Sequence, residues 1–262
     1  MRELERDEIP SPLSTPLTLV GRGRVGRSLA AAAERAGLDA ELVSHEELGF
    51  IPPGTAAMLC VPDDAITETA GRLGSSPPAL VGHVSGATTL DALAPAAGRG
   101  AATFSLHPLQ TFADGETQTE GTPAAIAGST VESLAYACSL AEALGMRPFE
   151  VPEEKRAAYH AAAAMASNLM VALEESATEV LARIGLDDAR ELLAPLVLRT
   201  AANWAERGPA ALTGPVARGD RATVQRHRVA LAENSPELVR LYDVLAMRAE
   251  ATAWESLHGM AS

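Results

Sequence analysis

The chain has 262 residues, of which 47% are hydrophobic and 21% are charged, and its net charge is −13 at neutral pH. These values are typical of a globular protein with one large domain or two modest ones. The acidic charge argues against nucleic acid as a partner, because a polyanion would be repelled. The apolar runs fall short of the roughly 18–20 residues that span a bilayer, so we expect no membrane partner.

Residues 1–16 are charged and rich in Pro and Ser, without the apolar centre of a secretory signal, and we expect a disordered tail. The two cysteines, Cys60 and Cys138, lie in apolar runs and are expected to be reduced core residues. Both observations favour a cytoplasmic protein.

The first ordered element predicted is a short strand over 17–20, followed by three glycines and an Ala-rich helix that ends near Gly37. Gly21, Gly23 and Gly26 have the G-x-G-x-x-G spacing. In this motif the first glycine makes a tight turn, the second lets a pyrophosphate approach the backbone, and the third lets the helix pack on the strand. The N-terminus of the helix would then bind the phosphates. The alternative is a glycine-rich turn without a ligand. The expected cofactor residues of this loop are Gly21, Arg22, Gly23, Arg24, Val25 and Gly26.

A second strand is predicted over 40–44, and its last residue bears on the choice of cofactor. An Asp or Glu at this point binds the ribose 2′-OH of NAD, whereas this strand ends in Ser44. Ser44 is compatible with a 2′-phosphate, so the sequence favours NADP, with NAD or coenzyme F420 left open. Arg22 and Arg24 would supply positive charge to that phosphate, or they simply face solvent.

Further strands are predicted over 56–61, 79–84, 101–106, 124–128 and 149–151, with a helix over 131–144. Strands that alternate with helices indicate parallel β-α-β units and a doubly wound α/β sheet. We therefore expect a Rossmann domain over residues 17–152.

From about residue 153 the pattern becomes wholly helical. Helices are predicted over 153–184, 188–207, 221–233 and 236–258, with a loop rich in Gly and Pro over 212–220. Residues 153–262 are thus expected to form an all-α domain.

Ligands of open α/β sheets bind beyond the carboxyl ends of the strands, so the residues that follow strands are the candidates. Val61, Pro62 and Asp63 follow one strand and are expected near the cofactor. Ser85 follows the next and would bind a substrate oxygen, or it caps a turn. His107 follows the one after and would be a general acid or base, or a turn residue held by Pro108.

The helix after Pro152 carries Tyr159, His160, Ser167 and Asn168 on an Ala-rich surface. Such polar groups need partners when they are buried, and a crevice between domains or a satisfied core network would supply them. Arg218 either binds an acidic substrate or pairs with Asp220. Metal-ligand spacing is missing, so we expect no metal.

The chain resembles the Rossmann-like family that carries the C-terminal domain of unknown function DUF2520. That family is related to 6-phosphogluconate dehydrogenase, pyrroline-5-carboxylate reductase, ketopantoate reductase and F420-dependent NADP oxidoreductases. The resemblance is carried by the motifs at 20–26, 61–66, 85–87, 107–112, 159–162 and 212–220.

The resemblance implies a homodimer formed through the helical domain and an NADP-linked oxidoreductase that acts on a small carbonyl or imine compound. Relatives place a Lys on the first long helix of the second domain, where this chain has His160 and Asn168. Prephenate dehydrogenases also carry a Ser and a His-Pro after corresponding strands. We therefore expect Ser85, His107, His160 and Asn168 to be the catalytic residues. A non-catalytic NADP-binding sensor or scaffold dimer and a ketopantoate-like reductase are the alternatives.

Overall fold

The structure is a computed structural model that describes residues 14–46 and 48–259. These residues form two compact units, which divide between Met165 and Ala166. We call them the α/β unit and the helical unit. Most of the tail expected over 1–16 lies outside the described residues. Of the part that is described, Thr15 is buried.

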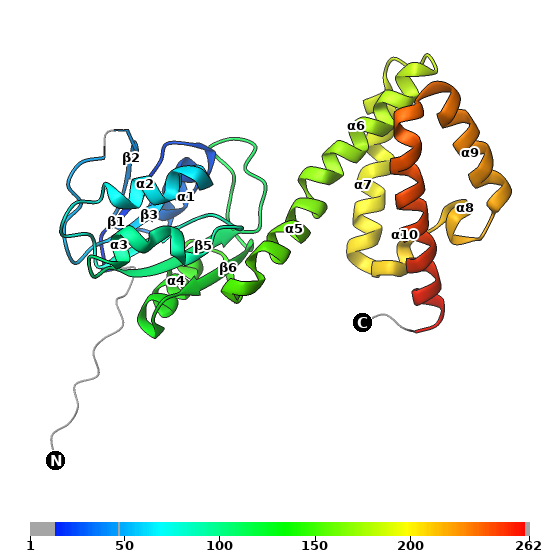
Figure 1. Cartoon of the computed structure of the whole chain (residues 1–262). Coiled ribbons are helices and arrows are strands. Elements are labelled where there is room, and N and C mark those ends of the chain that lie inside the picture. Colours follow the sequence, from blue (N-terminus) through cyan, green and yellow to red (C-terminus); the bar gives the residue numbers. More distant parts are fainter. Residues whose placement is uncertain (1–13, 47, 260–262) are drawn as a thin grey trace. The chain divides into compact units, whose positions relative to one another are not determined.

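The α/β unit is built on one seven-stranded sheet with the order β2-β1-β3-β4-β5-β6-β7 (Figure 1). Because β1 pairs with β2 on one side and with β3 on the other, the strand order reverses between β1 and β3. The strands are β1 (Leu17–Val20), β2 (Ala40–Val43), β3 (Ala56–Leu59), β4 (Leu80–His83), β5 (Ala102–Pro108), β6 (Pro123–Gly128) and β7 (Arg147–Glu150).

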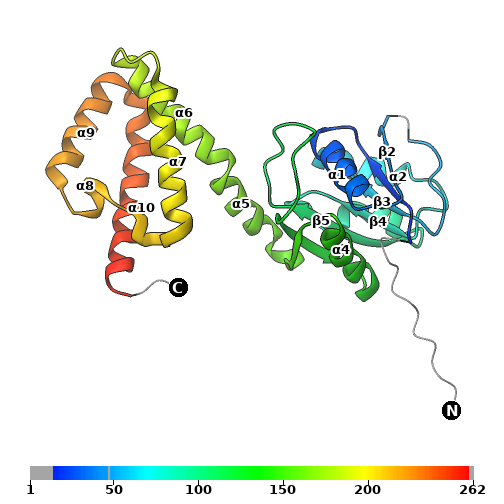
Figure 2. The same cartoon turned by 180° about the vertical axis from the view of Figure 1, so that it is seen from behind.

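Helices cover both faces of this sheet, which confirms the doubly wound α/β fold. One apolar core joins Leu19 and Met58 of the sheet to α1 (Arg24–Arg35) and α4 (Val131–Ala143). Figure 2 shows α4 beside β5. The other core joins Leu59 to α2 (Ile66–Gly71) and α3 (Ala94–Ala97). Successive strand residues thus feed opposite cores, as the alternation of side chains along a strand requires. Three short 3-10 turns complete the unit: η1 (Asp63–Ala65), η2 (Leu90–Leu93) and η3 (Glu153–Lys155).

The expectation of parallel strands throughout is wrong for the last two strands. β6 runs antiparallel to β5, and β7 follows the direction of β6. A parallel pair needs a crossover connection that is usually helical. Residues 109–122, which join β5 to β6, contain no helix, so β6 returns in the opposite direction.

The long helix expected over 153–184 is interrupted. After η3 the chain forms α5 (Arg156–Ala166) and α6 (Asn168–Arg183), and Ser167 between them departs from helical backbone angles. Ser and Asn side chains compete for backbone hydrogen bonds and so weaken a helix interior.

The helical unit contains α6, α7 (Ala189–Arg207), α8 (Gly214–Ala217), α9 (Arg221–Asn234) and α10 (Val239–Leu257), with turns η4 (Gly208–Ala211) and η5 (Pro236–Leu238). Among its described residues only Ala189 and Ser235 are buried. Large apolar side chains such as Leu198, Trp204 and Met247 are instead exposed by 72%, 65% and 63%. This unit therefore has very little core of its own.

Two sequence expectations concern cysteines and membranes. Cys60 is buried and Cys138 is half-buried, and both are free thiols. In the part of the chain that the structure describes, no helix has the length and apolar character needed to cross a membrane.

Candidate active site

The glycine loop after β1 has the geometry that its spacing predicts. Gly21 has a φ of +124°, and a Cβ there would lie 2.3 Å from the Cys60 carbonyl oxygen. A Cβ on Gly26 would lie 1.9 Å from the Gly21 carbonyl oxygen, so this glycine lets α1 close on the loop. Gly23 differs, because a Cβ there would meet nothing within 4 Å. Two glycines are needed for packing, and the third leaves open space.

The same loop leaves the N-terminus of α1 open to an anion. Gly23 is the N-cap residue and has extended backbone angles, and no side chain caps the helix. Its first turn contains no acidic residue. The first N–H groups of a helix and its positive dipole end favour a bound phosphate. Val25 is half-buried in this turn, and Arg22 and Arg24 are exposed beside it.

The ends of β2 and β3 lie next to the glycine loop. The Gly21 N–H donates to the Val43 carbonyl at 2.9 Å, which places Ser44 beside the loop. Ser44 Oγ accepts a hydrogen bond from the Glu46 N–H at 3.3 Å. Val61 is buried after β3, whereas Pro62 and Asp63 are exposed.

Ser85 lies in a tight turn after β4, and its hydroxyl is used inside that turn. Ser85 Oγ donates to Thr88 Oγ1 at 2.9 Å and accepts from the Thr88 N–H at 3.0 Å and the Ala87 N–H at 3.3 Å. The backbone N–H of Ser85 donates to Nδ1 of the buried His83 at 3.2 Å. These contacts correspond to the turn-capping alternative for Ser85.

His107 lies within β5 and not after it, which corrects the expected strand end at residue 106. β4 pairs with β5 only as far as Ser105, whereas antiparallel β6 pairs with it through Pro108. The continued pairing with β6 lengthens β5. His107 still stands near the carboxyl end of a strand that is parallel to β1, β3 and β4.

One face of α5 brings two further side chains to His107. Tyr159 Oη lies 2.8 Å from His107 Nδ1. The rings of His107 and His160 meet edge to face with centroids 5.8 Å apart. A Cβ on Gly86 would lie 2.6 Å from His160 Nδ1 and 2.8 Å from His107 Nε2. Both imidazoles therefore border the Gly86 backbone, and only a glycine leaves them room.

The charge state of His107 follows from its surroundings. Burial, then the His160 ring and then the Arg156 guanidinium lower the pKa of His107 to about 4, against a weaker opposing effect of the Asp63 carboxylate. His107 is therefore neutral at pH 7, and one ring nitrogen can accept a proton. Burial raises the pKa of the Tyr159 phenol, so it stays protonated.

Arg156, at the start of α5, lies beneath this cluster and is a residue that the sequence did not single out. Its side chain is fully buried and donates to the Ser85 carbonyl at 2.6 Å and to Ser105 Oγ at 2.8 Å. The signal that could have found it is spacing, because Arg156, Tyr159 and His160 stand at i, i+3 and i+4 on one helix face.

The remaining predicted residues belong to the helical unit. Asn168 opens α6 and is exposed, and Arg218 follows α8 and is also exposed. The Asp220 carboxylate caps α9 through the Thr223 N–H at 3.0 Å, and among the described residues it forms no ion pair with Arg218. In the described part of the chain no cluster of three His, Cys, Asp or Glu side chains is placed to hold a metal ion.

Comparison with known proteins agrees with this architecture. Residues 122–249 match the family model of the domain of unknown function DUF2520. The "putative NADP oxidoreductase BF3122" from Bacteroides fragilis is 24% identical, covers 92% of this chain and 100% of its own, and superposes with a TM-score of 0.75. Protein TM1727 from Thermotoga maritima is 25% identical over 92% of this chain and 99% of its own, with a TM-score of 0.73.

A more distant likeness is to a reductive aminase from Aspergillus terreus, solved in complex with NADPH and ethyl levulinate. It is 15% identical, covers 90% of this chain and 93% of its own, and has a TM-score of 0.63. No curated protein matches the chain. The chain therefore shares a Rossmann-like sheet and a following helical unit with these solved structures, and its residues 122–249 match DUF2520, in agreement with the resemblance noted in the sequence.

Proposed function

We propose that this protein is an NADP-dependent oxidoreductase that moves hydride between the nicotinamide ring and a small carbonyl or imine compound. The observation that carries the proposal is that a cluster of proton-transfer side chains and the glycine loop lie at the same edge of the sheet. His107, His160 and Tyr159 meet beside Gly86 at the carboxyl ends of β4 and β5. The glycine loop follows the carboxyl end of parallel β1 in the same sheet.

The residues of the glycine loop fit a dinucleotide. The open space at Gly23 lets a pyrophosphate approach the backbone, and the uncapped N-terminus of α1 would bind its charge. Ser44 in place of an acid tolerates a 2′-phosphate, and Arg22 and Arg24 add positive charge beside it. The reductive aminase of similar fold, solved with NADPH, supports the same choice.

The nicotinamide ring would supply or accept the hydride, and the chain must handle the accompanying proton. In the His107 tautomer that has its proton on Nδ1 and donates it to Tyr159 Oη, Nε2 is the free acceptor beside Gly86. A neutral imidazole at that position takes the proton of an alcohol or amine as the substrate is oxidised. The same atom returns the proton in the direction of reduction. His160 borders the same space and would orient the substrate.

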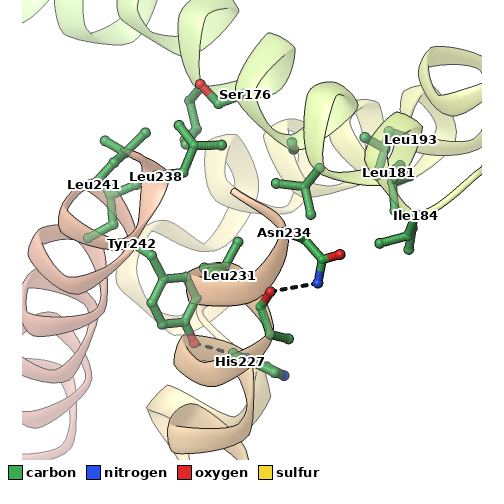
Figure 3. A pocket seen from close by; sticks show the side chains of 15 residues that line it. Ser176, Leu181, Ile184, Leu193, His227, Leu231, Asn234, Leu238, Leu241 and Tyr242 are labelled. Carbon is green, nitrogen blue, oxygen red and sulfur yellow. Dashed lines mark hydrogen bonds between the residues drawn. The ribbon is translucent and has the colours of Figure 1, made fainter. Parts of the chain in front are cut away.

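We also propose that the protein is a homodimer formed through the helical unit. Large apolar side chains on α7 and α10 are more than half exposed, and a monomeric soluble protein rarely exposes so much apolar surface. The unit also contains an apolar cavity of about 440 Å³ lined by residues of α6, α7, α9 and α10, with a hydrogen bond between His227 and Tyr242 at its edge (Figure 3). A second copy that covers these helices would give the unit the core that it lacks.

The test has a binding arm and a turnover arm. NADPH and NADH are titrated by fluorescence, and NADPH oxidation is then followed with a panel of keto acids, ketopantoate and cyclic imines. His107→Asn and His160→Ala are expected to keep NADPH affinity and to lower kcat by roughly 100-fold or more, the usual contribution of a positioned acid or base. His258→Gln, on an exposed histidine at the end of α10, is the matched control and should behave as wild type.

Each outcome has a distinct meaning. Full turnover in His107→Asn would contradict its proposed acid-base role, and full turnover in His160→Ala would contradict the proposed role of His160 in orienting the substrate. Tight NADPH binding without hydride transfer to any member of the panel would favour a cofactor-binding sensor or scaffold dimer. Failure to bind either dinucleotide would reject the proposal as a whole.

A further inference from the structure

A fully buried arginine lies under the candidate active site and has no role in the chemistry proposed above. Arg156 has no exposed surface, and its nearest carboxylate oxygen, Glu153 Oε1, is 3.5 Å away. Burying a guanidinium costs free energy unless hydrogen bonds replace its water. Here two bonds do so for the terminal nitrogens: Nη2 donates to the Ser85 carbonyl at 2.6 Å and Nη1 donates to Ser105 Oγ at 2.8 Å, whereas the buried Nε has no hydrogen-bond partner among the described residues.

Those two acceptors belong to the strands that build the site. Ser85 starts the turn that presents Gly86, and Ser105 is the residue of β5 two positions before His107. Arg156 is therefore hydrogen-bonded both to the turn after β4, which contains Gly86, and to β5, which contains His107. The Glu153 carboxylate adds a further link, since its Oε2 accepts from the Leu90 N–H at 2.6 Å.

Because Arg156 lies at the start of α5, its hydrogen bonds also fix the position of the residues that follow it on this helix. Tyr159 and His160 follow Arg156 by three and four residues, and side chains at these spacings lie on one face of a helix. Arg156 is the first residue of α5, so the point at which it is held sets the start and the rotation of this face. Tyr159 then reaches His107 Nδ1, and His160 reaches Gly86.

We propose that Arg156 is the positioning residue of this site: its guanidinium fixes the first turn of α5 to the ends of β4 and β5, and so places Tyr159 and His160 against His107. The positioning stands on contacts within the α/β unit, whereas its effect on turnover rests on the proposed oxidoreductase function. Arg156 touches none of the reacting atoms in this scheme and acts through the residues that it holds.

The positive charge of Arg156 has a second effect, which provides a readout without any substrate. It is one of the groups that lower the pKa of His107 to about 4. The charged and titratable groups that face His107 come from α5, β4 and η1, and they are His160, Arg156, Tyr159, His83 and Asp63. Removing the guanidinium should therefore raise the pKa of His107.

The experiment follows histidine ring signals by NMR in the full chain without cofactor. In Arg156→Met, which keeps an unbranched apolar stem but removes the guanidinium and its charge, we expect the His107 titration midpoint to move upward from about pH 4. The ¹⁵N signal of Nδ1 should also lose the signature of its bond to Tyr159. Arg99→Met is the matched control, because Arg99 also donates to a backbone carbonyl, that of Ala70 at 2.8 Å. It should leave both signals unchanged.

A second variant covers the case in which Arg156→Met does not fold. Ser105→Ala removes one of the two acceptors and keeps the charge, and we expect a changed Nδ1 signature for His107 in that variant as well. A folded Arg156→Met protein with the wild-type His107 midpoint and Nδ1 signature would overturn the proposal. If Arg156→Met is unfolded, wild-type signals in Ser105→Ala would do the same.

Kinetics separate this proposal from the proposed function. Once a substrate is known, Arg156→Lys, which keeps the charge but not the two-pronged donor, should lower kcat by roughly 100-fold through misplacement of Tyr159 and His160. The Kd for NADPH should not change, because the glycine loop is untouched. If no substrate is turned over at all, the NMR result in the cofactor-free protein still decides the role of Arg156.

Discussion

Gly23 and Gly26 offer a sharp test, because one glycine is needed by the fold and the other by a ligand. A Cβ on Gly26 would lie 1.9 Å from the Gly21 carbonyl oxygen, which is backbone and cannot turn away. A Cβ on Gly23 would meet nothing within 4 Å, and its φ of −72° and ψ of −176° suit any residue. Alanine at Gly26 should therefore lower stability, whereas alanine at Gly23 should lower affinity for the dinucleotide and leave stability almost unchanged.

The magnitudes follow from these contacts. Overpacking costs about 1–3 kcal/mol, and the better helix propensity of alanine returns at most about 1 kcal/mol, so Gly26→Ala should be destabilised. In a unit of this size each kcal/mol lowers Tm by about 2–4 °C. For Gly23→Ala, a poorer N-cap and a less flexible unfolded chain nearly cancel, leaving a change within about 0.5 kcal/mol. Its Kd for NADPH should rise at least tenfold, about 1.4 kcal/mol, because the methyl group occupies the space left for the pyrophosphate.

Thermal unfolding by circular dichroism and titration of NADPH fluorescence measure the two effects. Gly23→Ala should unfold as wild type and bind poorly. If it binds NADPH as tightly as the wild-type protein, the pyrophosphate does not approach Gly23, and the glycine loop is only a turn.

Gly86→Ala should keep NADPH affinity but lose turnover, because its methyl group would push His107 and His160 apart; wild-type kcat in this variant would contradict the geometry of the site. The free energy of unfolding should fall as the pH is lowered from 6.5 to about 4, where the unfolded chain protonates His107 and His83 and the folded chain does not, and His107→Asn should make this part of a plot of Tm against pH less steep; an unchanged slope would refute the assignment for His107. Val244→Glu, on the exposed apolar surface of α10, should shift the molar mass measured by light scattering toward the monomer, whereas the control Arg35→Glu, exposed at the end of α1 in the α/β unit, should not; equal masses for both would argue against a dimer through α10.

The sheet was largely predictable from the sequence, because its strands are short apolar runs bounded by Gly and Pro. The glycine loop was also predictable, since the roles of Gly21 and Gly26 follow from spacing alone. The direction of β6 could not be predicted from the residues of the strand itself. It depends on the connection over residues 109–122, which contains no helix. The lack of a helical pattern in this stretch was the sequence signal for an antiparallel strand.

The candidate site was predictable in its residue types but not in its contacts. His107 and His160 were singled out separately, one at a strand end and one on a helix. The spacing of His107 and His160 in the sequence does not show that their rings lie in contact. Gly86, which both rings border, looks in the sequence like an ordinary turn residue. Arg156 belongs to a residue type that is almost never fully buried unless it is paired. Its spacing from Tyr159 and His160 places it on their helix face, but only the three-dimensional contacts show that it is buried against β4 and β5.

The burial of Arg156 also determines how the chain can be divided. The change of sequence pattern suggests cutting at residue 152, but a fragment that ends there would lose the guanidinium that satisfies the Ser85 carbonyl and the Ser105 hydroxyl. Each buried group left without a partner costs about 1–3 kcal/mol. The same cut would also open the space that Arg156 fills between two strands. The α/β unit therefore includes α5 as a structural part, and a fragment meant to fold alone should retain α5 through Met165.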